Sequence, residues 1–206
     1  MAVRPLCIEP HPVLRGIARP VEAFTKDLKR LAHDLIDTMY ANDGIGLAAP
    51  QVGLDLQLFV ANPSQERGRE LIVVNPALEA AEGRAGVVEG CLSLPDVWER
   101  VRRAARVRMN GYDVTGRPLT CEAQGLLAII LQHEFDHLQG RLFIDRLSWL
   151  RRRRALAKLK SFEARGSRLE GRRGQPEPPR PDPACRGGQA PPARPDVPGR
   201  ASPEPS

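Results

Sequence analysis

Apolar residues recur at helical spacing along residues 24–41 and predict an amphipathic helix there. Its apolar stripe consists of Phe24, Leu28, Leu31, Leu35, Ile36 and Met39. The polar residues that this spacing places on the outward face are Lys26, Lys29, Arg30, His33 and Asp34. The sequence Asn42-Asp43-Gly44 then ends the helix, because these residue types favour turns.

A second helix is predicted at residues 125–140, where there is no proline and Gly140 occupies the position of a C-terminal cap. Apolar residues lie on every side of this helix, namely Leu126, Leu127, Ile129, Ile130 and Leu131. A helix that is apolar all round is normally buried, so we expect it to run through the core.

Strand-like segments rich in Val, Ile and Leu lie before and beside the second helix. They are residues 57–61, 70–80, 84–92, 101–112 and 119–123. Residues 5–20 carry four prolines and are expected to form an extended arm with a short helical turn near residues 13–18. The predicted class is α+β, with antiparallel β-sheets packed around a central buried helix.

Length and composition indicate one domain, because 206 residues with 41% hydrophobic content can bury a sizeable core. We expect this domain to span residues 1–165 and the Pro-, Arg- and Gly-rich residues 166–206 to be a disordered tail. No apolar run is long enough for a membrane span, and the N-terminus has no apolar signal-peptide core. Four unevenly spaced cysteines favour a reducing compartment, so we expect a cytoplasmic protein.

Residues 148–165 predict a basic C-terminal helix, and the chain as a whole has a formal net charge of +6. The basic residues of this segment are Arg151, Arg152, Arg153, Arg154, Lys158, Lys160 and Arg165. A solvated charged face is the simpler explanation of such a run. Contact with RNA or another phosphate-rich surface is the functional one.

Two histidines interrupt the apolar pattern of the second helix, with Glu134 directly after the first of them. One helical turn separates His133 from His137, so both imidazoles lie on the same face. The H-E-x-x-H pattern supplies two metal ligands and a general base for metal-assisted hydrolysis. Two ordinary core histidines are the alternative, but burying these three groups without a partner is costly, which favours a metal site.

A catalytic metal site needs a third protein ligand and an open position for water. The metzincin spacing would require a histidine at the position of Phe143, so that pattern fails. The remaining distant candidates are His11, His33 and, in an Arg/Lys-rich segment, Glu163. Cys91, which follows Gly90, would complete a Cys/His/His set; the alternative for Cys91 is a buried structural thiol.

Three separated motifs resemble those of the peptide deformylases, in matching order and spacing across roughly residues 1–160. They are Gly44-Ile45-Gly46-Leu47-Ala48-Ala49-Pro50-Gln51, Glu89-Gly90-Cys91-Leu92-Ser93 and Gln132-His133-Glu134-Phe135-Asp136-His137-Leu138. The resemblance implies a hydrolase that removes the formyl group from the formyl-methionine of nascent chains and releases formate. It also implies the deformylase fold around the H-E-x-x-H helix.

The same resemblance assigns roles to individual residues. It implies that Cys91, His133 and His137 bind one divalent ion, usually iron(II), with zinc, nickel or cobalt able to occupy the same site. Glu134 would be the general acid and base acting on a metal-bound water. The Gln51 amide and the Leu92 backbone N–H would stabilise the oxyanion.

Further positions that the resemblance matches concern substrate binding. Those predicted to bind the methionine end of the substrate are Gly44, Gly46, Val87, Leu126, Ile129 and Ile130. For Ile129 and Ile130, plain core packing is the competing explanation. Glu89 and Arg103 are expected to form a structural ion pair. Trp98 stands where some relatives have a substrate-contacting arginine, which puts the binding of residues beyond methionine in doubt.

The partners expected from the resemblance are formylmethionyl peptides and, through the basic helix, the ribosome, with neither membrane nor DNA among them. Two alternatives make different predictions. A zinc peptidase of another class would use a third ligand other than Cys91. A binding module without activity would contact the ribosome and release no formate.

Overall fold

The computed structural model describes residues 2–170, with side chains described up to residue 162. This part of the chain forms helices α1 (Lys26–Ala41), α2 (Gly125–Leu138) and α3 (Trp149–Glu170), and 3-10 helices η1 (Pro12–Arg15), η2 (Ala49–Val52) and η3 (Phe143–Arg146). The strands are β1 (Gly46–Ala48), β2 (Leu58–Ala61), β3 (Leu71–Glu82), β4 (Ala85–Cys91), β5 (Leu94–Arg103), β6 (Arg106–Tyr112) and β7 (Pro118–Gln124).

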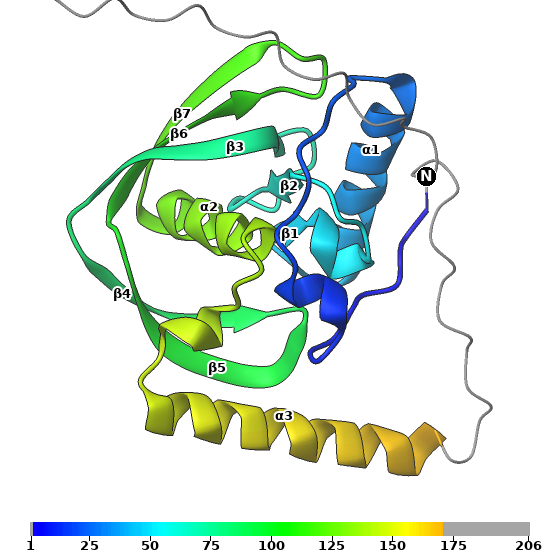
Figure 1. Ribbon diagram of the computed structural model, residues 1–206, viewed down its shortest axis with the longest axis vertical. Helices are drawn as coiled ribbons and strands as arrows, with labels where there is room; N and C mark the ends of the chain where they lie inside the picture. Colours follow the sequence, from blue (N-terminus) through cyan, green and yellow to red (C-terminus); the bar gives the residue numbers. More distant parts are fainter. Residues whose placement is uncertain (1, 171–206) are drawn as a thin grey trace, which may run out of the picture. The chain divides into compact units, whose positions relative to one another are not determined.

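The strands form two antiparallel sheets that lie around α2 (Figure 1). One sheet has five strands in the order β1-β2-β3-β6-β7, and the other is the β4–β5 hairpin. In Figure 1, α2 lies between these sheets, and α3 runs along the far side of β5. The predicted α+β class with antiparallel sheets around a central helix is confirmed.

Most of α2 is buried against the five-stranded sheet. Leu131 and Leu138 are fully buried and belong to a core cluster that includes Phe59 of β2 and Met109 of β6. The prediction of burial on all sides was wrong for the first turn, because Leu126 is 47% exposed there. The helix begins at the surface and becomes buried only after one turn.

Gly140 ends α2 as the sequence predicts, with a left-handed φ of 68°. A Cβ at this position would lie 2.6 Å from the carbonyl oxygen of Arg15. The N-terminal arm therefore passes too close to the end of α2 for any other residue at this position.

Thr25 directly precedes helix α1, and its hydroxyl accepts a hydrogen bond from the Leu28 N–H and so caps the helix. Four residues of its apolar stripe are buried, whereas Phe24 and Leu31 are only partly buried, and His33 is exposed. The outward placement of Asp34 was wrong, because this residue is only 5% exposed. Its carboxylate pairs with the guanidinium of Arg4 at 3.0 Å, a partner that only tertiary structure supplies.

The strand prediction failed between residues 92 and 105. In place of one strand over residues 101–112, the chain forms β5 and β6 with a break at residues 104–105. Strand β5 exposes Trp98 and Arg100 on one face, and its many charged residues gave a sequence pattern that did not indicate a strand. The short strand β1 and helix η2 also went unpredicted, in a segment that the sequence presents as a turn.

Helix α3 continues to Glu170, beyond the predicted end of the domain at residue 165, and the remainder of the predicted tail, residues 171–206, lies outside the described residues. The helix packs on β5 through Ala155 and Leu159, which are buried with Val97 and Val101. Within residues 2–170 no helix is long and apolar enough to cross a membrane.

Candidate metal and catalytic site

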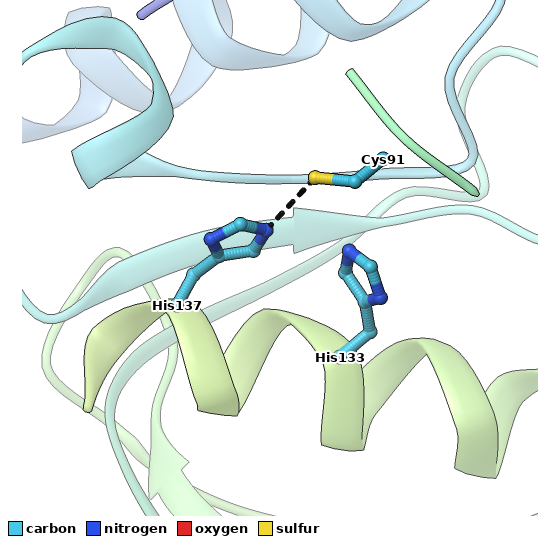
Figure 2. Close-up of side chains that lie close together, drawn as sticks. All are labelled: Cys91, His133 and His137. Carbon is cyan, nitrogen blue, oxygen red and sulfur yellow. Dashed lines mark hydrogen bonds between the residues drawn. The ribbon is translucent and has the colours of Figure 1, made fainter. Parts of the chain in front are cut away.

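Cys91, His133 and His137 converge at one point between the β4–β5 hairpin and α2 (Figure 2). Their ligand atoms all lie within 4.8 Å of one another, and Cys91 Sγ is 3.2 Å from His137 Nε2. The sulfur points at the two imidazoles from the opposite side, as Figure 2 shows. In the part of the chain with described side chains, this is the one such group of three metal-ligating residues.

Local structure explains how the three side chains meet. His133 and His137 are one turn apart on α2 and are 9% and 1% exposed. Cys91 ends β4 directly after an irregularity in the pairing with β5, where the register shifts between Glu89 and Cys91. Such a bulge redirects the strand, and here it aims the thiol at α2.

Behind the three residues, a buried ion-pair network holds His133 in place. His133 Nδ1 is 2.9 Å from Glu89 Oε2, and Arg103 donates to both Glu89 oxygens at 2.7 and 2.8 Å. Burial would raise the pKa of Glu89, but the bonds to Arg103 and His133 lower it to about 2. The ion pair expected between Glu89 and Arg103 is confirmed. A fixed Nδ1 partner leaves the other ring nitrogen free to bind a metal.

Asp136, a part of this network that sequence reasoning missed, lies between two arginines. Arg103 reaches it at 2.5 Å, and Arg146 of η3 binds both of its oxygens. Asp136 lies within the third motif, but nothing in the sequence pairs it with residues as distant as Arg103.

Glu134 is 3% exposed, and its Oε2 has no hydrogen-bond partner among the described residues. Burial raises the pKa of this carboxyl to about 7, against the opposing effect of His133 and Arg103. The backbone of Gly46 in β1 lies directly against it, since a Cβ at Gly46 would come within 3.0 Å of the carboxylate and of Ile130. A carboxyl with this pKa can both accept and donate a proton near neutral pH.

The side chain of Gln51, from η2, lies next to Cys91. Its Oε1 accepts a hydrogen bond from the Ala48 N–H at 2.8 Å, which fixes the amide. Its Nε2 lies 3.5 Å from Cys91 Sγ and 3.4 Å from the hydroxyl of Ser93, a contact that sequence reasoning missed although Ser93 belongs to the second motif. Leu92 directly follows Cys91, so its backbone N–H lies beside the thiol.

The residues predicted to bind methionine differ in their surroundings. Ile129 and Ile130 are 9% and 4% exposed, and Ile130 belongs to the main core cluster. Leu126 is half exposed one turn earlier on α2, and Val87 of β4 is partly buried opposite Val101. A Cβ at Gly44 would lie 3.1 Å from the side chain of Leu92, so Gly44 lies close to the site from the α1 side.

The remaining candidates lie elsewhere. His11 caps η1, His33 is exposed on α1, and the side chain of Glu163 is outside the described residues. Trp98 is 65% exposed, and its ring lies on the backbone of Gly90, where a Cβ would come within 2.8 Å of it. An exposed aromatic ring therefore stands next to the residue that precedes Cys91.

Comparison with known proteins agrees with this geometry. The family model described as polypeptide deformylase matches residues 3–153. A peptide deformylase of Alkalilimnicola ehrlichii is 44% identical over 81% of this chain and 94% of its own length, and one of Brucella suis is 45% identical over 79% and 94%. A crystal structure of a peptide deformylase from Legionella pneumophila aligns with a TM-score of 0.78 at 41% identity, covering 84% of this chain and 100% of that one.

Proposed function

Because the chain belongs to the peptide deformylase family, it is a hydrolase that removes N-formyl groups from nascent peptides, and we propose that Cys91, His133, His137 and Glu134 carry out this reaction. The observation that carries the proposal is the convergence of three ligand atoms beside a buried carboxyl that has an unpartnered oxygen. The proposed substrates are proteins that begin with formylmethionine, and the product is formate.

One divalent ion fits the three donors, which present one sulfur and two imidazole nitrogens within 4.8 Å of one another. This donor set suits iron(II), our first choice, and also zinc, nickel or cobalt. When bound, the ion would act as a Lewis acid and lower the pKa of a water toward about 7. The three protein ligands leave a position free for that water.

Glu134 is the proposed general base and then general acid. With its pKa near 7, the carboxyl takes a proton from the attacking water and later delivers it to the departing amine nitrogen. Its buried position beside Gly46 excludes bulk water, so the proton passes between Glu134 and the reacting atoms.

The oxyanion that develops on the formyl group needs hydrogen-bond donors. We assign this role to the Gln51 side-chain amide and the Leu92 backbone N–H. The bond from Ala48 orients the Gln51 amide in advance, so no reorganisation is needed during the reaction. A donor of this kind contributes on the order of 10²–10³ in rate.

The methionine side chain is proposed to bind where Gly44, Gly46 and Val87 approach α2. Leu126 supplies apolar surface at the open end, and Ile129 and Ile130 close the site on the inner side. The glycines at positions 44 and 46 bring backbone close to this space because they lack side chains.

The basic face of α3 is the proposed contact with the ribosome, where nascent chains emerge in the cytoplasm. Arg151 and Arg152 are paired with Glu99 and Asp145. The basic side chains that are exposed and form no ion pair within the described part of the chain are Arg153, Arg154, Lys158 and Lys160. Arg153 also lies over the ring of Trp149. Several exposed positive charges on one helix suit an RNA backbone.

The test is formate release from a formyl-Met-Ala-Ser peptide by iron(II)-loaded protein prepared without oxygen. We expect release by the parent and a loss of about 10³-fold or more in Glu134→Gln, which keeps the shape but cannot take the proton. A variant of an exposed acid on α1, Asp27→Asn, serves as the control. No release by metal-loaded parent would contradict the proposal and favour the inactive binding module.

A further inference from the structure

A cavity of about 430 Å³ lies against a different face of α2 from the one that carries the metal ligands. On the helix its wall consists of Gln132, Phe135 and Asp136, whereas His133 and His137 point to the hairpin. The turn between β3 and β4 and the end of β5 form the opposite wall, and Arg146 of η3 completes it. None of the roles proposed above uses this cavity.

Four arginines and one carboxylate line the cavity, which makes it strongly basic. The arginines are Arg84, Arg102, Arg103 and Arg146, and the carboxylate is that of Asp136. Asp136 is already saturated, because Arg103 and Arg146 bind its two oxygens at 2.5–2.6 Å. Among the described side chains, Asp136 forms no ion pair with the other two arginines.

Arg84 and Arg102 are the arginines without a counter-ion. Both are exposed at the mouth of the cavity, and within the described side chains neither forms an ion pair or a hydrogen bond. Guanidinium groups that share a concave surface without a carboxylate raise the local positive potential. An anion that enters there meets donors with no internal partner to displace.

The backbone that carries these groups is fixed. The side chain of Gln132 accepts from the Ala104 N–H at 2.9 Å and donates to the Ala104 carbonyl at 3.0 Å, which ties the end of β5 to α2. Arg103, next to Arg102 in the chain, is fully buried in its ion pairs with Glu89 and Asp136. A preorganised wall lowers the cost of ligand binding.

We propose that this cavity binds a phosphate group, with Arg84 and Arg102 as its charge-neutralising donors. A phosphate carries up to two charges and three strong acceptor oxygens, so it can engage the guanidinium groups of Arg84 and Arg102 at once. A monoanionic carboxylate would satisfy one guanidinium in bidentate fashion and leave the other unpaired. The phosphate can come from free inorganic or small-molecule phosphate, or from an RNA backbone.

The test measures phosphate binding by isothermal titration calorimetry on metal-loaded, full-length protein, with chloride at matched ionic strength as the reference. We expect one inorganic phosphate per chain, and at least about tenfold weaker binding in the double variant Arg84→Ala, Arg102→Ala. The matched control is Lys26→Ala, Lys29→Ala, which removes the same two charges from the exposed face of α1. The control should bind phosphate as the parent does.

A short single-stranded RNA added to the phosphate-saturated protein distinguishes the two sources. Displacement of phosphate by RNA assigns the site to a nucleic-acid backbone, and retention assigns it to free phosphate. The proposal is overturned if the parent binds neither, if the double variant binds phosphate like the parent, or if the control weakens equally. Formate release, measured on the same samples, is expected to be unchanged in the double variant. A failure of the phosphate-binding proposal can therefore be distinguished from a failure of the proposed deformylase activity.

Discussion

The backbone of Gly46 lies against the carboxyl group of Glu134 so closely that even a methyl group at position 46 would collide with it. Gly46→Ala must therefore displace Glu134, Ile130 or strand β1. Displacing a proton-transfer group by an ångström costs about 10²-fold in rate, so we expect a kcat loss of that order. The measurement is steady-state formate release.

Gly16→Ala is the control for this substitution, because Gly16 is exposed and has an ordinary extended backbone. The nearest atom to a Cβ there is 3.7 Å away. It should retain parent activity. Equal rates for Gly46→Ala and the parent would mean that Glu134 does not need its present position.

Cys91→Ser should weaken metal binding strongly. The hydroxyl of serine remains protonated where a thiolate would bind, so one anionic ligand is lost. We expect substoichiometric metal after purification and after dialysis against a weak chelator, measured by elemental analysis. The control is Cys121→Ser, which changes a half-buried thiol on β7 and should keep its metal. If Cys91→Ser also kept its metal, the third ligand would be another residue, as expected for a zinc peptidase of another class.

Gln51→Ala removes one proposed oxyanion donor. We expect kcat to fall by about 10²–10³-fold with a smaller change in KM, because the interaction strengthens only as charge develops. Metal content should not change, which separates this effect from damage to the metal site. Gln65→Ala, in an exposed loop, provides the comparison. A fall in substrate affinity alone would assign Gln51 to binding rather than to catalysis.

Glu89 should make stability depend on acid pH. Its pKa is about 2 in the folded protein and 4.5 ordinarily, so the folded state favours the charged form. The resulting stabilisation is fully present above about pH 4.5 and is lost as the pH falls toward 2. We expect Glu89→Gln to be destabilised at pH 7 and the gap to the parent to narrow on acidification.

This comparison requires free energies of unfolding from urea titrations at several pH values, with chelator present so that metal release does not contribute. Glu22→Gln, an exposed residue outside the network, should follow the parent at every pH. A gap between Glu89→Gln and the parent that stays constant down to pH 3 would show that the carboxylate is not stabilised by Arg103.

The parts of the site that local sequence predicts are those built within one element. The spacing of His133 and His137 needs only a helix, and Gly140 needs only a helix end. Cys91 is different, because its approach to α2 depends on the register shift in the β4–β5 hairpin. The residues alone favoured Cys91 over the other candidates but left a buried structural thiol as the alternative, and the family resemblance then assigned it the ligand role.

The errors share a physical cause, which is pairing across long sequence distances. Asp34 was expected at the surface, but it is buried, and an ion pair with Arg4 of the N-terminal arm compensates its charge. Strand β5 was missed because its exposed face carries Trp98 and Arg100, while its buried face depends on α3. The basic cavity beside Asp136 was invisible for the same reason, since its arginines come from separate elements.

The three metal-ligand residues join the β4–β5 hairpin to α2, although Cys91 and His137 are 46 residues apart in the sequence. A bound ion would therefore act as a cross-link between the β4–β5 hairpin and α2, much as a disulfide would. Loss of the ion would remove the cross-link at the Cys91 end of the hairpin, while the Gln132–Ala104 and Arg103–Asp136 contacts still join its other end to α2. Metal depletion or oxidation of the Cys91 thiol would then shorten the lifetime of the folded protein and also abolish its activity.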